Sequence, residues 1–147
     1  MFKDNYHSLS TTTEFLGVSR RLTLRSSVAV NGSTFKHNTA NYGGVLYTQG
    51  GDVTVETSLF YHHHAKFSGG VILATSDSTT GISMCIFSNN TAENNGGVVA
   101  VADRSVIIVK QSSFTGNRAH DNGGVIHLQQ SSASHWQYGQ FINNRKR

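Results

Sequence analysis

The sequence predicts an all-β protein, a right-handed parallel β-helix of about four coils with a period of about 27 residues. Three observations favour this fold. A phrase built on Phe and a Gly pair recurs along the chain, and the residues between its copies alternate with a period of two. The spacings of a helical repeat and of a leucine-rich repeat are both absent. The right hand follows from the preference of parallel crossover connections.

The recurring phrase is clearest at FSNNTAENNGGVV, which begins at Phe87, and at FTGNRAHDNGGVI, which begins at Phe114. Phe residues stand at positions 35, 60, 87, 114 and 141, so this anchor returns at a nearly constant interval. Gly pairs begin at positions 43, 69, 96 and 123 and return at the same interval. Two independent anchors therefore give one period, which is typical of a solenoid whose coils stack on their neighbours.

Each residue type in the phrase meets a demand of stacking. Phe fills the interior and stacks on the Phe of the next coil, about 4.8 Å away. The Asn three residues later can bond its amide to the next coil's amide. Ala is small where the chain bends, and the Gly pair permits positive φ at the corner. The predicted structural ladder consists of Phe35, Phe60, Phe87, Phe114, Phe141, Asn38, Asn90, Asn117 and Asn144, with His63 in the Asn place of one copy.

The positions around the phrase predict which side chains face inward. Five residues before each Phe stand large apolar side chains, namely Val30, Val55, Ile82, Val109 and Trp136. Two residues before each Phe stand small residues, namely Ser33, Ser58, Cys85, Ser112 and Gly139. The second residue after each Gly pair is aliphatic, whereas the third is varied and is predicted to face outward: Tyr47, Leu73, Ala100 and His127. Each coil is expected to contain about three short strands joined by turns.

The chain divides into two parts. Residues 1–19 are predicted to be an irregular or partly disordered lead, and residues 20–147 a parallel β-helix domain that starts with a partial coil. Neither end carries a clear polar cap, so we expect a fragment of a longer solenoid, whose further coils would be its neighbours. The opening residues do not resemble a signal peptide, so a targeting segment is expected to lie outside this chain.

Composition limits the function. The formal charge is +4, but the basic residues lie mostly near the two ends, which argues against a nucleic-acid-binding face. The single cysteine, Cys85, cannot form an intramolecular disulfide and is predicted to be a buried structural thiol. No phosphate-binding loop, dinucleotide fingerprint or nucleophile triad is present, and no cofactor is predicted.

Three acidic residues, Asp52, Asp77 and Asp103, each follow the second strand of a coil, and Arg104 lies beside one of them. Enzymes on this fold gather carboxylates with Lys or Arg on one outer face to cleave polysaccharides. The three residues are not in identical register, and Asp in turns commonly satisfies local backbone N–H groups. We therefore predict turn residues, and we keep a polysaccharide lyase or hydrolase fragment as the alternative.

A histidine run, His62, His63 and His64, raises the question of a metal site. Successive side chains of a strand point to opposite faces, so three consecutive His cannot reach one ion. At a corner two of them could, together with His37 or His120, but zinc needs three or four convergent ligands. A solvated turn is the preferred interpretation, and no metal site is predicted.

Two sequons place Asn at outward positions, at Asn31-Gly-Ser and Asn89-Asn-Thr. Asn31 and Asn89 are candidate glycosylation sites only if a eukaryotic cell exports the chain.

The phrases FSNNTAENNGGVV and FTGNRAHDNGGVI resemble the repeats of the chlamydial polymorphic outer-membrane proteins, which carry F-x-x-N followed by G-G-A-I/L/V, and related pectate-lyase-like surface proteins. Here Val replaces the Ala after every Gly pair, at Val45, Val71, Val98 and Val125. The resemblance implies an extracellular or cell-surface β-helix that serves adhesion or display without catalysis. Its partner would be an unknown surface ligand, protein or carbohydrate, and not a nucleic acid.

Overall fold

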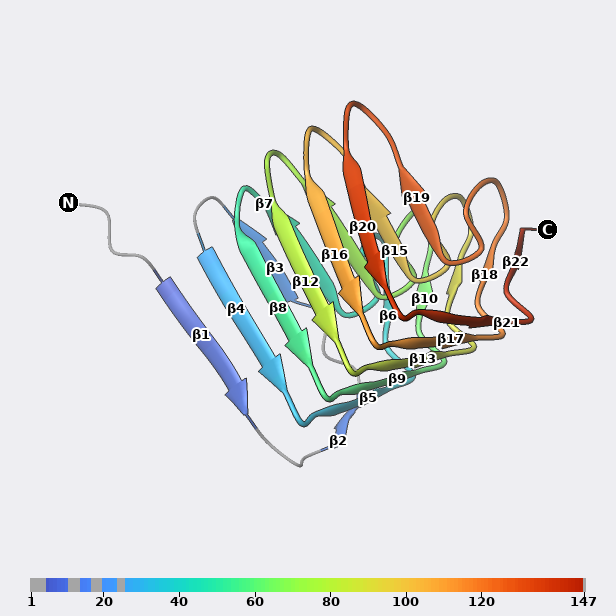
Figure 1. Cartoon of the computed structure of the whole chain (residues 1–147), viewed down its shortest axis with the longest axis horizontal. Coiled ribbons are helices and arrows are strands. Elements are labelled where there is room, and N and C mark those ends of the chain that lie inside the picture. The colour runs from blue at the N-terminus through green and yellow to red at the C-terminus, as the bar shows by residue number, and fades with distance from the viewer. Residues whose placement is uncertain (1–4, 11–13, 17–19, 24–25, 147) are drawn as a thin grey trace.

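The chain folds into stacked coils made only of strands and turns. The computed structural model describes residues 5–10, 14–16, 20–23 and 26–146. These residues form 22 strands in four parallel sheets, with no helix among them and so no membrane-spanning helix. Figure 1 shows the coils following one another from the N-terminal to the C-terminal end. The predicted parallel β-helix is confirmed.

The four sheets are named A, B, C and D, and their strands are given below. Each complete coil passes through them in the order A, B, D and C. Sheet A contains β1 (Asn5–Ser10), β4 (Ser26–Asn31), β8 (Asp52–Glu56), β12 (Thr79–Ser83), β16 (Val106–Lys110) and β20 (Ala133–Gln137). Sheet B contains β2 (Glu14–Leu16), β5 (Thr34–Lys36), β9 (Leu59–Tyr61), β13 (Ile86–Ser88), β17 (Ser113–Thr115) and β21 (Gln140–Ile142). Sheet D contains β6 (Thr39–Ala40), β10 (His64–Ala65), β14 (Thr91–Ala92), β18 (Arg118–Ala119) and β22 (Arg145–Lys146). Sheet C contains β3 (Arg20–Thr23), β7 (Leu46–Gln49), β11 (Ile72–Thr75), β15 (Val99–Val101) and β19 (Ile126–Leu128).

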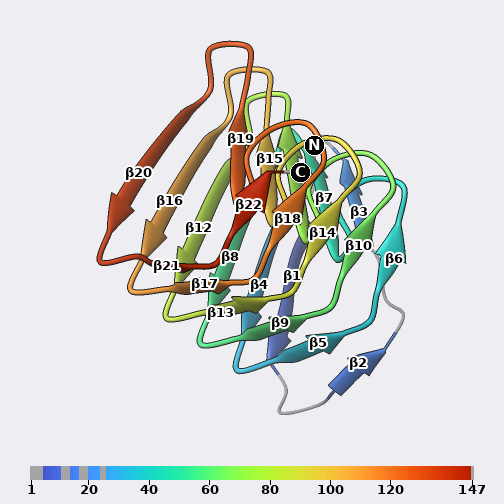
Figure 2. The same cartoon turned by 90° about the vertical axis from the view of Figure 1, so that its right-hand side faces the viewer.

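A complete coil therefore has four strands, not the three expected from sequence. The additional strand is the short strand of sheet D, such as Thr91–Ala92, which lies between the Phe and the Gly pair. A strand of that length is too short to show an alternating pattern. Figure 2 shows that sheet B joins sheet A to sheet D across the lower edge of each coil. The phrase thus spans two corners of the coil and the short strand between them.

The N-terminal part differs from the irregular lead expected for residues 1–19. Strand β1 pairs with β4, with Asn5 opposite Ser26. Strand β2 pairs with β5, with Phe15 opposite Phe35. This coil is shorter than the later ones, because Asn5 lies opposite Ser26, 21 residues further along the chain. A search for one fixed period does not reveal this first coil, because the coil is shorter than that period. The rest of residues 1–19 lies outside the described residues.

The interior is a continuous apolar core with one aromatic stack. The rings of Phe35, Phe60, Phe87, Phe114 and Phe141 lie nearly parallel, with successive centroids 5.1, 4.8, 5.0 and 5.2 Å apart. Phe60, Phe87 and Phe114 are fully buried, whereas Phe141 in the last coil is 52% exposed. Every ring lies over the next because the parallel register repeats unchanged from coil to coil.

Sheet C departs from simple alternation where each strand begins. The N–H groups of both Val71 and Ile72 donate to the Val98 carbonyl oxygen, at 2.8 and 2.9 Å. Two consecutive donors on one acceptor shift the pleat, so both side chains are buried. The next residue, predicted to face outward, is buried in two coils: Leu73 is 7% exposed and Ala100 is 4% exposed. Both line a groove on the outer face of sheet C and do not belong to the apolar core cluster.

The Asn column forms a hydrogen-bonded ladder at the corner between sheets B and D. The backbone N–H of Asn90 and its Nδ2 both donate to Oδ1 of Asn117, each at 3.0 Å. Asn117 makes the same two bonds to Asn144, each at 2.9 Å. Nδ2 of Asn117 also donates to the Phe87 carbonyl oxygen at 3.0 Å. Each carboxamide thus accepts from a backbone N–H that no strand pairs at this buried corner, and it also donates to a carbonyl oxygen of sheet B.

A second ladder of small polar groups lies at the corner between sheets A and B. The N–H of Ser33 donates to Oγ of Ser58 at 3.1 Å, and the N–H of Cys85 donates to Oγ of Ser112 at 3.1 Å. The Ser112 hydroxyl in turn donates to the Lys110 carbonyl oxygen at 2.8 Å. These small inward residues therefore form hydrogen bonds between coils, in addition to fitting the limited space at the corner.

The two glycines of each pair have different reasons to be glycine. The first adopts positive φ, for example 66° at Gly96. The second has no positive φ, but a Cβ on Gly97 would overlap with the carbonyl oxygens of Gly124 and Arg118. The expectation that the whole pair supplies positive φ is therefore correct only for its first member.

We predict that Asn117→Ala destabilises the protein by about 1–3 kcal/mol, because it leaves the Asn90 N–H without its partner in a buried corner. Chemical denaturation should show this loss. Asn122→Ala is the control, because its carboxamide bonds only the exposed Asn95 side chain and should cost less than about 0.5 kcal/mol. Equal losses for the two variants would refute the buried ladder.

We predict that Gly97→Ala costs about 3 kcal/mol or more, since the added methyl overlaps backbone atoms of the next coil that cannot move without breaking strand pairing. Gly81→Ala is the matched control. A Cβ at Gly81 would meet nothing closer than 3.9 Å, so this variant should be neutral or slightly stabilising. Thermal melting of both variants tests the difference, and a tolerated Gly97→Ala would contradict it.

Candidate functional site

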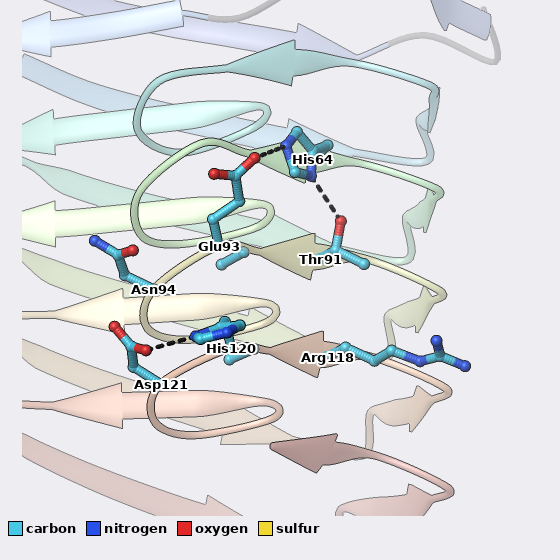
Figure 3. Close-up of a pocket in the computed structure, with 9 residues that line it drawn as sticks. His64, Thr91, Glu93, Asn94, Arg118, His120 and Asp121 are labelled. Atoms are coloured by element: carbon cyan, nitrogen blue, oxygen red, sulfur yellow. Dashed lines mark hydrogen bonds and ion pairs between the residues drawn. The ribbon is translucent and has the colours of Figure 1, made fainter. Parts of the chain in front are cut away.

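A groove lies on the outer face of sheet D. Strands β10, β14 and β18 place His64, Thr91 and Arg118 in register on that face. The turns that follow two of these strands add Glu93, Asn94, His120 and Asp121, which enclose a cavity of about 690 Å³. Figure 3 shows these side chains, which come from the successive coils of β10, β14 and β18.

Two histidine–carboxylate pairs occupy the groove, one coil apart. His64 Nε2 lies 3.2 Å from Glu93 Oε1, and its Nδ1 lies 2.9 Å from the Thr91 hydroxyl. His120 Nδ1 lies 2.7 Å from Asp121 Oδ1. Both pairs are well exposed, with side-chain exposed fractions between 39% and 67%. Exposed pairs of this kind contribute little to stability, so the groove is a surface and not a part of the core.

Thr91, His64 and Glu93 have the connectivity of a nucleophile, a base and an orienting acid. Acyl transfer also needs backbone N–H groups aimed at the developing oxyanion. In this groove the backbone N–H groups of Thr91, Glu93 and Asn94 donate to carbonyl oxygens of the preceding coil, at 2.8, 3.0 and 2.8 Å. Those of Arg118, His120 and Asp121 do the same, at 2.9, 3.1 and 2.7 Å. The stacking of coils therefore consumes the donors that an oxyanion hole would need.

Arg118 contributes the strong fixed cation of the groove. It makes no ion pair with any residue in the described part of the chain, and Figure 3 shows its side chain extending away from both histidine–carboxylate pairs. Arg145 lies opposite it in the parallel register of β22. The guanidinium is thus available for a planar, bidentate contact with an acidic group.

The histidine run is divided among three environments. His62 is exposed and stacks on His37, with centroids 5.2 Å apart. His63 takes the Asn place in the buried ladder, where its Nδ1 accepts the Asn38 N–H at 3.1 Å and its own N–H donates to Oδ1 of Asn90 at 3.0 Å. His64 faces the sheet D groove. No group of three His, Cys, Asp or Glu side chains suited to a metal ion occurs within the described residues.

The three aspartates of the alternative hypothesis do not converge. Asp52 is the first residue of β8 and lies opposite Thr79, whereas Asp77 and Asp103 occupy turns between sheets C and A in adjacent coils. Arg104 holds Asp77 in two bonds of 2.8 and 2.7 Å, which lower the pKa of that carboxyl. The structure shows no three-carboxylate site among these residues, because Asp52 is set two positions away in the register.

The remaining sequence candidates are placed as follows. Cys85 is buried beside Ser112, and burial raises the pKa of its thiol to about 11, which is the opposite of nucleophile activation. Asn31 and Asn89 both lie at exposed positions.

Sequence reasoning missed the groove acids and Arg118. They occupy variable columns within the recurring phrase, such as the residue six after each Phe, which is Asn41, Lys66, Glu93 and His120 in successive coils. The signal for the groove was a column whose charge changes from coil to coil in an otherwise regular repeat. Such a column must face outward, because unpaired charges are not tolerated inside the coil.

Comparison with known proteins agrees with the sequence resemblance. Residues 84–102 and 111–129 match the family model of the Chlamydia polymorphic membrane protein repeat. Each match runs from the corner before sheet B, through the Phe, Asn and Gly pair, to the sheet C strand. No curated protein and no solved structure matches the chain at a significant level. The predicted resemblance to this repeat is confirmed for two coils.

We predict that His63→Asn removes a loss of folding stability that the original protein shows as the pH is lowered. Burial lowers the pKa of His63 from 6.5 to about 4, so the neutral ring stabilises the fold fully above pH 6.5. That contribution is lost as the pH falls from 6.5 to 4 and amounts to about 3 kcal/mol. At pH 7 the variant should be neutral or slightly stabilised, because an Asn here restores the ladder.

Denaturation curves between pH 4 and pH 8 test this prediction. His62→Asn changes the exposed neighbour and serves as the control. Parallel pH profiles for the His63→Asn variant and the original protein would contradict the buried, neutral His63.

Proposed function

We propose that this chain is a non-catalytic, surface-displayed binding module that acts in adhesion through the outer face of sheet D. The match to the Chlamydia polymorphic membrane protein repeat supports display at a cell surface or outer membrane. The groove supports binding, because it gathers charged and polar side chains from neighbouring coils onto one rigid face. Preorganised side chains bind with little loss of conformational entropy.

The observation that carries the proposal is that the backbone N–H groups of Thr91, Glu93, Asn94, Arg118, His120 and Asp121 all donate to the preceding coil. These N–H groups are not available to stabilise an oxyanion, whereas the side chains of the groove remain available for recognition. The alternative, a polysaccharide-cleaving enzyme, lacks a cluster of carboxylates at the three candidate aspartates: Asp77 is neutralised by Arg104, and Asp52 lies apart.

The partner proposed here is a protein surface with an exposed carboxylate. Arg118 is the natural contact, because a guanidinium binds a carboxylate through two parallel hydrogen bonds. The two histidine–carboxylate pairs of the same groove supply further donors and acceptors. Arg118 therefore supplies the charged contact of the interface, and the pairs add polar contacts to it.

We predict that Arg118→Gln weakens binding of the fluorescently labelled protein to fixed epithelial cells. The half-saturating concentration should rise about tenfold, the effect of losing one charged hydrogen bond. Lys110→Gln is the matched control, since it removes the same charge from an exposed position at the end of β16 on sheet A.

Three outcomes would refute the proposal: no saturable binding, equal weakening by both variants, or no effect of Arg118→Gln. Equal weakening would show that net charge alone attracts the protein to cells.

A further inference from the structure

Two arginines lie side by side on the outer face of sheet D. Strand β22 follows β18 in this sheet (Figure 2), and the parallel register places Arg145 directly opposite Arg118. Each arginine is the first residue of its strand, and in β18 the alternate residue, Ala119, is buried. Arg118 is partly exposed and Arg145 is exposed. The two side chains therefore extend from one face of the sheet, on strands about 4.8 Å apart.

The backbone beneath the two arginines is fixed by contacts between coils. The Arg118 N–H donates to the Asn90 carbonyl oxygen at 2.9 Å. The Arg145 N–H donates to the Asn117 carbonyl oxygen at 3.0 Å. Asn117 and Asn144, which precede the two arginines, are joined in the Asn ladder by two bonds of 2.9 Å. A ligand therefore does not have to order the backbone that presents the two guanidinium groups.

No carboxylate in the part of the chain that the structure describes neutralises this arginine pair. None of the ion pairs there includes Arg118 or Arg145. Glu93 and Asp121, the acids of the adjoining groove, each bond a histidine instead. Like charges that face each other across neighbouring strands repel, and an anionic ligand would remove that repulsion. The pair therefore favours binding of negative charge.

The positive charge is confined to two positions of its outward column. In the preceding coils the same column continues with Thr91, His64 and Thr39, none of which is a lysine or an arginine. Glu93 and Asp121 add negative charge beside it. A long polyanion, such as a sulfated polysaccharide, would find no third lysine or arginine along this column and would meet these carboxylates. A ligand with two neighbouring negative groups fits the surface better.

We propose that Arg118 and Arg145 together bind an extended acidic segment of a partner protein that carries carboxylates at two alternate residues. Each guanidinium is a planar fork that binds one carboxylate through two hydrogen bonds. Alternate residues of an extended segment point to one side and lie about 6.8 Å apart. This separation suits two cations that leave neighbouring strands and repel each other, whereas a single dianionic group would draw them together. The contact rests on the proposed function, because it lies in the same interface, and it adds Arg145 as a second contact residue.

The test is titration of the whole chain with three end-blocked peptides at low ionic strength, followed by amide NMR shifts. The alternate-acid peptide Ser-Glu-Ser-Glu-Ser should bind about tenfold more tightly than the single-acid peptide Ser-Glu-Ser-Gln-Ser, the effect of one further charged hydrogen bond. The third peptide, Glu-Ser-Ser-Ser-Ser-Ser-Glu, carries the same charge as the first at a wider separation. It should bind like the single-acid peptide, because its two carboxylates do not reach both guanidinium groups at once.

Two variants locate the contact. Arg145→Gln and Arg118→Gln should each abolish the tenfold preference for the alternate-acid peptide, because only one guanidinium remains. Neither position is buried, so both variants are expected to fold normally. Lys110→Gln removes an equal charge from sheet A and is the matched control, in which the tenfold preference should persist.

The proposal is overturned if no peptide binds, if all three bind equally, if Arg145→Gln keeps the preference, or if inorganic phosphate binds more tightly than the alternate-acid peptide. The last result would assign a single dianionic group to the arginine pair.

Binding to epithelial cells separates this contact from the proposed function. Weaker cell binding by Arg118→Gln but not by Arg145→Gln would keep the adhesive surface and remove the paired contact. The peptide preference without saturable cell binding would keep the paired contact and remove adhesion.

Discussion

The hydrogen bonds between identical corners of successive coils are the interaction on which the rest of this protein depends. Strand pairing holds the straight parts, but each corner turns buried backbone groups away from any strand partner. At one corner the Asn117 carboxamide bonds the Asn90 N–H, the Asn90 side chain and the Phe87 carbonyl oxygen. At another the Ser112 hydroxyl bonds the Cys85 N–H and the Lys110 carbonyl oxygen. A corner that lacked them would leave buried polar groups without partners. The Phe stack then follows, because fixed corners hold each ring over the next.

The same constraint explains the substitutions within the repeat. His63 keeps the acceptor that the ladder needs, since its Nδ1 takes the place of an Asn oxygen, but its Nε2 has no hydrogen-bond partner among the described residues. Cys85 keeps the size of the serine that it replaces and donates to the Ser83 carbonyl oxygen at 3.1 Å. Both residues preserve the spacing of the coils and weaken the polar network locally. Internal variation is therefore limited to groups that can still accept or donate at the same point.

Side chains on the outer faces of the sheets are not subject to this constraint, so the residue types on each face can differ from coil to coil. The sheet D face carries Arg118 and two histidine–carboxylate pairs, whereas the sheet C face carries tyrosines and neutral amides over an apolar floor. The backbone beneath both faces is engaged in contacts between coils. A rigid support with variable side chains is well suited to binding, because recognition can change while the fold does not.

The sequence alone determined the period, the parallel solenoid and the internal columns. Stacking requires the same residue type at the equivalent position of each coil, and this requirement produces a repeat in the sequence. It did not show the short sheet D strands or the early coil at β1 and β2, because very short strands and a shortened coil leave no signal at the common period. Only the tertiary structure separated Asp52 from Asp77, divided the three histidines among a ladder, a stack and a groove, and brought His64, Glu93 and Arg118 onto one face. Outward columns need not repeat, so their sites depend on which residues adjacent coils place side by side.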